Sequence, residues 1–307
     1  VDLPSVYAKK TVDQKPFLFD MHFSSSSPIR NISAKYGDDF YIHARTIDKN
    51  KSHGRGFSGL ILLGKYVGQN VKIPESGLDI WSDWLFVNAT DWQNFLDKYL
   101  EEDKKNQEPQ DQITLNSIFV HAKHWLILGL KLGQMQMRIN PLKSYYFIIV
   151  DGDQVKGRMK VPFDLAQQPL LANFDRLVLN RSEMVPSKKE PNPSEWPSLN
   201  IQCQACQFNQ GYYNQLTLRT THKKNGLTID TLKWQNQYQA SDLTGDWYQL
   251  ADKQNAHLKG AVTFISAGDW LKSHKLSNLL GSGSGPLSFD VLVPGGLVKP
   301  NWSQVSG

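Results

Sequence analysis

The sequence lacks the features that mark several large protein classes. No apolar run approaches the roughly 18 residues that a membrane-spanning helix needs, and no signal peptide is recognisable at Val1. The 34 Lys and Arg residues exceed the 29 Asp and Glu residues only slightly, for a net charge of +5, and they are scattered along the chain. A nucleic-acid-binding protein gathers basic and aromatic residues on one face, so we expect no nucleic-acid partner. Both ends stop abruptly, so we expect an excised piece of a longer protein.

Catalytic and metal-binding motifs are missing as well. The sequence has no G-x-S-x-G nucleophile elbow and no phosphate-binding loop that ends in Lys-Ser/Thr. His121 and His124 are three residues apart, which on a strand places them on opposite faces, so they are poor joint metal ligands. We therefore expect no catalytic residue, no metal site and no cofactor, and we interpret the protein as one that is not an enzyme.

The chain has two cysteines, Cys203 and Cys206, in the sequence QCQAC. A structural zinc site needs four ligands, and no second ligand pair follows. In a straight strand, residues three apart are separated by about 10 Å, beyond the limit of about 7 Å between the Cα atoms of a disulfide. The apolar alternation slips by one residue at this point, as in a β-bulge. A disulfide and two free, packed thiols both remain open.

The sequence is rich in alternating apolar and polar residues, the pattern of a strand with one dry and one solvated face. The stretch LGLKLGQMQMRI alternates with one shift at Gly133, and VKGRMKV, QLTLRTT and PLSFDVLV alternate throughout. The residues expected on dry faces are Leu128, Leu130, Leu132, Met135, Met137, Ile139, Val155, Met159, Val161, Leu216, Leu218, Leu287, Phe289, Val291 and Val293. Lys156, Arg158 and Lys160 fall on the wet face. The pattern predicts a mainly β, antiparallel chain; periodicity alone favours an ordinary closed core for its dry faces.

Two stretches have helical spacing instead. Apolar residues from Trp92 to Leu100 recur on one helical face, and Thr90 with Gln93 forms a capping-box pattern, which predicts a helix at about 90–101. A second short helix is expected at about 266–280. We expect surface connections at 101–112 and 184–198, and three segments of the sheet at 1–110, 111–183 and 199–307. A weak repeat relates 115–137 to 199–218.

Several longer motifs resemble one protein family. The stretch IPESGLDIWSDWLFVNATDWQNFL is similar to a Pro–Gly–Leu turn, strand and Trp-initiated helix of the long periplasmic AsmA-like proteins of Gram-negative bacteria, in their YhdP branch. VDGDQVKGRMKVPFD resembles its Gly-flanked strand, and GLTIDTLKWQNQYQASDLTGDWYQ ends in its Gly-x-Trp at Gly245 and Trp247. The resemblance runs nearly end to end. One departure is Val293, where the branch often has Trp before its Pro-Gly turn.

The resemblance implies a function that the residue patterns alone do not. Such proteins are anchored in the inner membrane by an N-terminal segment, which is missing here, and extend through the periplasm as a long, curved β-sheet that carries phospholipids toward the outer membrane. It implies that the dry-face residues above line a hydrophobic groove for acyl chains, and that the outer membrane or an envelope protein is the distal partner. A periplasmic scaffold or assembly factor with the same sheet, and an envelope enzyme, are the rival interpretations.

Overall fold

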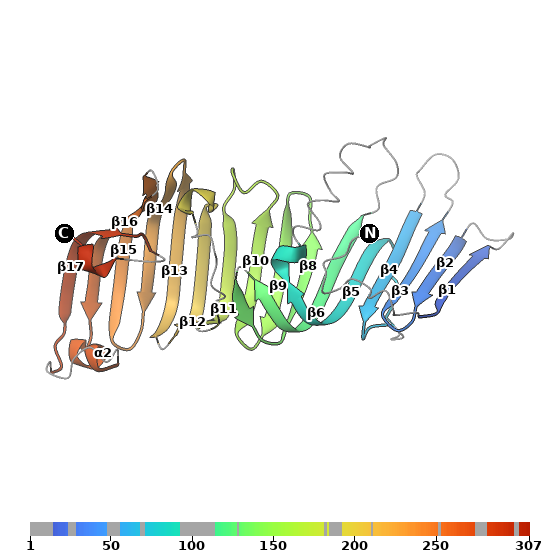
Figure 1. Ribbon diagram of the computed structural model, residues 1–307, viewed down its shortest axis with the longest axis horizontal. Coiled ribbons are helices and arrows are strands. Elements are labelled where there is room, and N and C mark those ends of the chain that lie inside the picture. The colour runs from blue at the N-terminus through green and yellow to red at the C-terminus, as the bar shows by residue number, and fades with distance from the viewer. Residues whose placement is uncertain are drawn as a thin grey trace. The chain divides into compact units, whose positions relative to one another are not determined.

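The computed structural model describes residues 15–23, 29–47, 56–67, 71–92, 114–127, 129–180, 183, 192–209, 211–250, 253–273, 281–297 and 301–307. These residues form 17 strands of one open, mixed sheet and two short α-helical segments (Figure 1). The expected mainly β architecture with two short helices is confirmed. The chain divides into two compact units, which we call the first unit (Val1–Leu142 and Val150–Asp153) and the second unit (Lys143–Ile149 and Gln154–Gly307). The expected division into three segments is a different partition and stays a prediction.

The first unit consists of strands that pair in the order of the sequence. They are β1 (Phe17–Phe23), β2 (Ile29–Tyr36), β3 (Phe40–Ile47), β4 (Gly56–Gly64), β5 (Gly77–Asn88), β6 (Leu115–Ile127), β7 (Leu130–Leu132) and β8 (Met135–Pro141). β7 and β8 both pair with β6 and together act as its one antiparallel neighbour. The pairings β4–β5 and β5–β6 are parallel, and the others are antiparallel.

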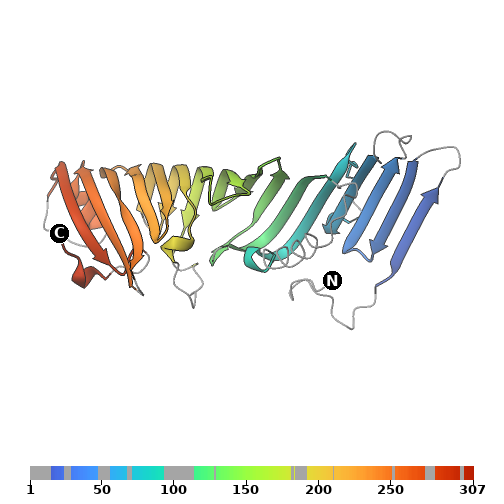
Figure 2. The same ribbon diagram turned by 90° about the horizontal axis from the view of Figure 1, so that it is seen from above.

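The second unit has the same serial order. Its strands are β9 (Tyr145–Gly152, of which 145–149 belong to this unit), β10 (Val155–Pro162), β11 (Leu170–Leu179), β12 (Leu199–Phe208), β13 (Gly211–Lys223), β14 (Gly226–Gln235), β15 (Gln239–Leu250), β16 (Lys253–Phe264) and β17 (Gly285–Pro294). β11 and β12 are parallel, whereas each pairing from β12 to β17 is antiparallel. In both views the strands of each unit form a single layer (Figure 1 and Figure 2).

The sheet is therefore mixed rather than wholly antiparallel. A parallel neighbour requires the chain to return to the end at which the previous strand began, so it needs a connection of a dozen or more residues. Such connections precede β5, β6 and β12, and two of them contain the stretches 101–112 and 184–198 that the sequence marked as surface connections. The weak repeat has a structural counterpart, because β6 and β12 each follow a parallel crossover and then pair with an antiparallel strand.

Both expected helices begin close to their predicted starts. Residues 89–92 are helical, and the rest of the expected helix lies outside the described residues. The side-chain oxygen of Asn88 accepts a hydrogen bond from the backbone N–H of Thr90 at 3.1 Å, so Asn88 caps this helix and Thr90 lies inside it. The capping role expected for Thr90 is therefore corrected to Asn88. The second helix, α2 (Ala267–Ser273), starts after Ser266, whose hydroxyl donates to Asp269 at 2.7 Å.

A tryptophan occupies the interruption between β7 and β8. The indole N–H of Trp125 reaches the carbonyl oxygens of Ala122 at 3.2 Å and Met135 at 3.0 Å, which belong to paired residues on neighbouring strands. Trp125, Leu132 and Met135 are all buried. The parity shift seen at Gly133 therefore marks a break in the ladder that a side chain fills.

Candidate apolar binding face

Backbone register places one continuous row of apolar side chains across the first unit. Directly opposed residues on neighbouring strands share a face of the sheet. Following the pairs from β1 to β8 gives the row Phe19, Ala34, Ile42, Ile61, Ile80, Ile118 and Ile139. The neighbouring row, two residues along each strand, contains Phe40, Leu63, the buried Ser82, Val120 and Met137. We call this side the dry face of the first unit.

The second unit has a dry face of its own. The register from β10 to β17 aligns Met159, Ala172, Ile201, Leu218, Leu232, Leu243, Gly260 and Phe289 in one row. Neighbouring rows on the same face contain Leu216 opposite Cys203, Val155 opposite Leu177, and Val291 opposite Leu258. Every member of the long row is apolar or glycine, so a hydrocarbon chain meets no polar side chain along it.

The opposite side of the second unit, its polar face, carries the hydrophilic half of each alternating pattern. One row reads Arg158, Asn173, Gln202, Thr217, Lys233, Asp242, Ala261 and Ser288. Lys233 and Asp242 form an ion pair at 2.8 Å. The hydrogen bond from His257 lowers the pKa of the exposed Asp290 carboxyl group. Water therefore solvates this side, and the two faces differ sharply in polarity.

Short described elements lie at both margins of the second unit's dry face: α2 packs Trp270 against Phe264 of β16 at one margin, with ring centroids 5.5 Å apart, and two 3-10 helices lie at the other. The 3-10 helix η2 (Pro193–Glu195) contacts β14 and β15, and η3 (Trp302–Gln304) contacts β17. Beneath them Leu227, Trp247, Ala256 and Val293 form a buried cluster. Between the two margins, the described strands form a single layer (Figure 2).

Two glycines on this dry face allow unusually close contact between strands. A Cβ atom on Gly245 would lie 2.0 Å from the carbonyl oxygen of His257, and one on Gly260 would lie 2.3 Å from that of Asp242. Above Gly260 the space is taken by Leu243, whose Cδ2 would be 2.9 Å from the added atom. Leu243 is consequently only 5% exposed.

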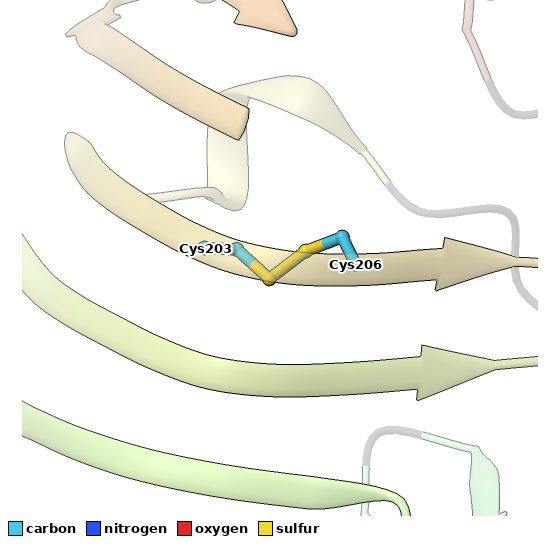
Figure 3. The surroundings of a disulfide bond; sticks show 2 residues. All are labelled: Cys203 and Cys206. Atoms are coloured by element: carbon cyan, nitrogen blue, oxygen red, sulfur yellow. A yellow bond between two sulfur atoms is a disulfide. The ribbon is translucent and has the colours of Figure 1, made fainter. Parts of the chain in front are cut away.

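The structure joins Cys203 and Cys206 by a disulfide, so the alternative of two free thiols is not the arrangement found. Their Cα atoms are 5.9 Å apart, far closer than in a straight strand, and Gln204 between them is left unpaired in the ladders to both β11 and β13. This irregular stretch places both sulfurs on the dry face, and the two cysteines are 2% and 1% exposed. Figure 3 shows the disulfide lying along β12 where the strand bends.

Similar irregularities continue into the neighbouring strands. The β10–β11 register skips Asp175, and the β12–β13 register skips Gln215, which has a positive φ of 53°. The β13–β14 register shifts beside Gln215, between Asn214 and Thr217, and shifts again further along the strand at Asp230. Irregular pairing of this kind bends strands and increases their twist, and the positions at Asp175, Gln204 and Gln215 are neighbours across β11, β12 and β13.

The structure places the residues expected on dry faces as follows. Met137 and Ile139 lie on the dry face of the first unit, and Met135, opposite Ala122, lies beside them. The dry face of the second unit contains Val155, Met159, Val161, Leu216, Leu218, Leu287, Phe289, Val291 and Val293. Leu130 and Leu132 form β7, beyond the break at Gly133, and Leu128 lies outside the described residues.

Sequence reasoning missed much of the first unit's dry face. Ile42, Ile61, Ile80 and Ile118 form its central row, yet none was expected there. The period-two signal was present in YIHARTI, but GLILLG is apolar at successive positions. Both faces of β4 are in fact occupied, since Leu60 and Leu62 are buried on the side opposite Ile61.

Groups suited to catalysis do not gather in the described part of the chain. No cluster of three or more His, Cys, Asp or Glu side chains there could hold a metal ion. His121 instead contacts Asp83 at 3.2 Å and Gln134 at 3.2 Å. None of the described helices has both the length and the apolar character needed to cross a membrane.

An open, single-layer β-sheet with a continuous apolar row on one face of each unit defines a class of protein that presents an extended hydrophobic surface. Comparison with known families agrees with the resemblance seen in the sequence: the family described as YhdP protein matches residues 1–307. The chain belongs to the YhdP family. No curated protein and no solved structure matches it.

Proposed function

We propose that this chain is a segment of an inner-membrane-anchored periplasmic bridge that carries phospholipids between the inner and outer membranes, with acyl chains held on the dry faces. The observation that carries the proposal is the unbroken apolar row of each unit, which described elements leave uncovered over most of its length. Large uncovered apolar surfaces on soluble proteins mark sites of ligand, partner or membrane contact. Membership of the YhdP family supports an envelope location and a lipid-transport role.

The chemistry of the rows suits transport better than tight binding. Each methylene group removed from water contributes about 0.8 kcal/mol, so an acyl chain of ordinary length gains several kcal/mol on such a surface. The attraction is not directional. A chain that shifts by one strand therefore exchanges one apolar neighbour for another, for example Leu218 for Leu232, without breaking a hydrogen bond. Successive positions have similar free energies, which allows movement along the row.

The disulfide supports an oxidising compartment. Disulfides persist in the periplasm and are rare in the reducing cytoplasm of most bacteria. No catalytic step is needed for a hydrophobic conduit, so the proposal includes no reaction, metal or cofactor.

The test is site-specific photo-crosslinking in the full-length protein in living cells. A photoreactive amino acid at Leu232, on the dry face, is compared with one at Lys233, its neighbour on the polar face. Phe289 and Ser288 on β17 provide a second matched pair. We expect phospholipid adducts, read by mass spectrometry, at the dry-face positions and not at their polar-face neighbours.

The result also separates the rival function. A scaffold or assembly factor covers its apolar face with a protein, so Leu232 and Phe289 would then give protein adducts and no lipid. That outcome overturns the conduit. Equal lipid labelling of both faces also overturns it, because adventitious contact with membranes does not distinguish the faces.

A further inference from the structure

A hollow of 570 Å³ lies at one margin of the second unit. It is formed where the β12–β13 hairpin and the β14–β15 turn come together beside the end of α2. Phe208, Tyr213 and Tyr238 supply its aromatic walls, and Ser273 of α2 lies at its edge. The dry face described above leads directly to this place.

Aromatic contacts connect the hollow to the dry face. Tyr213 is opposite Cys206 and therefore lies on the dry face. Its ring centroid is 5.6 Å from that of Phe208 and 5.9 Å from that of Trp234, which continues the apolar surface onto β14. A hydrocarbon chain on the dry face can thus extend into the hollow without crossing a polar barrier.

The polar groups of the hollow are uncharged. Besides phenol hydroxyls, the lining includes the amides of Asn214, Asn236 and Gln237, and neither a carboxylate nor an ammonium group is among its described lining residues. The side-chain oxygen of Asn236 accepts the backbone N–H groups of Tyr238 and Gln239, which leaves its NH₂ group as the available donor. Amide and phenol donors suit ester carbonyl and phosphodiester oxygens, and the absence of a carboxylate removes the repulsion that an anion would otherwise meet.

The donor of Tyr213 lies between the hollow and the dry face. Its ring contacts Trp234, whose indole N–H is buried and has no hydrogen-bond partner among the described residues, although Trp234 is not one of the residues that line the hollow. Burial also raises the pKa of Tyr213, so its hydroxyl keeps the proton with which it donates.

A glycine makes room for that hydroxyl. A Cβ atom on Gly211 would lie 2.7 Å from the Tyr213 hydroxyl oxygen, so a larger residue would displace the phenol from its place in the hollow. An adjoining hollow shares Gln237, Tyr238 and Ser273 and adds Lys272, which is paired with Asp269 at 3.7 Å. The charged residues therefore stand outside the aromatic part of the site.

We infer that this hollow holds the glycerol–phosphodiester end of a phospholipid whose acyl chains lie on the dry face of the second unit. The inference rests on the proposed function and adds an orientation to it: the polar end of the lipid is held at the β12–β13 and β14–β15 margin, away from the margin covered by η2.

The test uses two photoreactive phosphatidylethanolamines with the purified full-length protein. One carries a diazirine on the head-group amine, and the other carries it at the end of an acyl chain. We expect the head-group probe to label 208–214 and 236–238, and the acyl probe to label the dry-face strands around Leu218 and Leu232. Labelled peptides are identified by mass spectrometry.

Variants make the test specific. The double variant Tyr213→Phe/Tyr238→Phe keeps both rings and removes two donors. We expect head-group labelling of the hollow to fall up to about 25-fold, since each of the two hydrogen bonds removed contributes about 1 kcal/mol, with acyl labelling unchanged. Tyr248→Phe, on the polar face of β15, is the matched control and should change neither.

The outcomes separate the two proposals. If both probes label the same dry-face peptides, or the double variant leaves head-group labelling intact, the hollow is not a head-group site while the lipid conduit stands. If neither probe labels the chain, the conduit itself fails and this inference fails with it.

Discussion

Removing the bond between Cys203 and Cys206 should loosen the centre of the second unit without unfolding the protein. The bond closes a loop of about four residues. The chain-entropy relation then gives about 6 cal/mol/K, or roughly 2 kcal/mol at room temperature. Without the bond, nothing holds the two Cα atoms at 5.9 Å, and β12 is free to straighten toward the spacing of about 10 Å of a regular strand.

Hydrogen exchange of the full-length protein measures this effect strand by strand. Because 1.4 kcal/mol corresponds to a factor of ten, amides that exchange through local opening of β11, β12 and β13 should exchange up to about 25-fold faster. Amides of β15 and β16, which have an uninterrupted register with each other, should change little. The first comparison is between the disulfide-bonded protein and the same protein after reduction, because both forms keep the two buried sulfur atoms.

The variant Cys203→Ala/Cys206→Ala is the second comparison, and it removes apolar volume as well as the bond. The reasoning is refuted if reduction leaves exchange in β11–β13 unchanged. It is refuted equally if β15 and β16 accelerate as much as β12, because the bond would then stabilise the unit as a whole rather than the irregular stretch around Gln204.

Three further predictions concern other parts of the chain. Asn88→Ala should destabilise the helix that begins at Ala89 by about 1 kcal/mol, and Thr90→Ala should do so by much less, as read by exchange of the first helical amides. Met137→Asp places a carboxyl group on the dry face and should reduce phospholipid recovered with the full-length protein, whereas Gln136→Asp, on the other face, should not; equal lipid recovery from both would contradict the face assignment. In a spectrophotometric titration, the Tyr213 phenol should ionise above pH 10.0, its ordinary value, so its contribution to stability should be complete below that pH and lost as the pH rises further; the difference spectrum against Tyr213→Phe isolates it.

Local patterns predicted the face of a strand wherever alternation was uninterrupted. In PLSFDVLV the alternate residues Leu287, Phe289, Val291 and Val293 share one side because successive side chains of a strand point to opposite faces, whatever its neighbours are. The predicted starts of the two helices lay within one residue of the observed starts at Ala89 and Ala267, because helix starts are also marked by local sequence features. The helix cap is Asn88 and not Thr90. Both residue types serve as N-caps, and in the structure the Asn88 side chain accepts the hydrogen bond from the backbone N–H of Thr90.

Features that depend on distant residues were not predictable in this way. No local sequence pattern near β5 or β12 indicates that these strands pair in parallel with β4 and β11, because the direction of pairing depends on the path of the long connection that precedes them. The break at Gly133 appeared as a parity shift, but its filling by Trp125 did not. The alternation also does not indicate what covers a dry face. An open apolar surface and a closed core therefore give the same sequence pattern, and only the arrangement of the strands distinguishes them.

Gly245 and Gly260 have a consequence for how this chain tolerates change over generations. Alanine is ordinarily among the mildest replacements within a sheet, yet at these two positions its single methyl group meets a carbonyl oxygen of the next strand at 2.0 and 2.3 Å. A leucine on the same face can exchange for valine or methionine with modest cost. Substitution is therefore least tolerated at dry-face positions such as these, which have no side chain, and most tolerated where the dry face has a large apolar one.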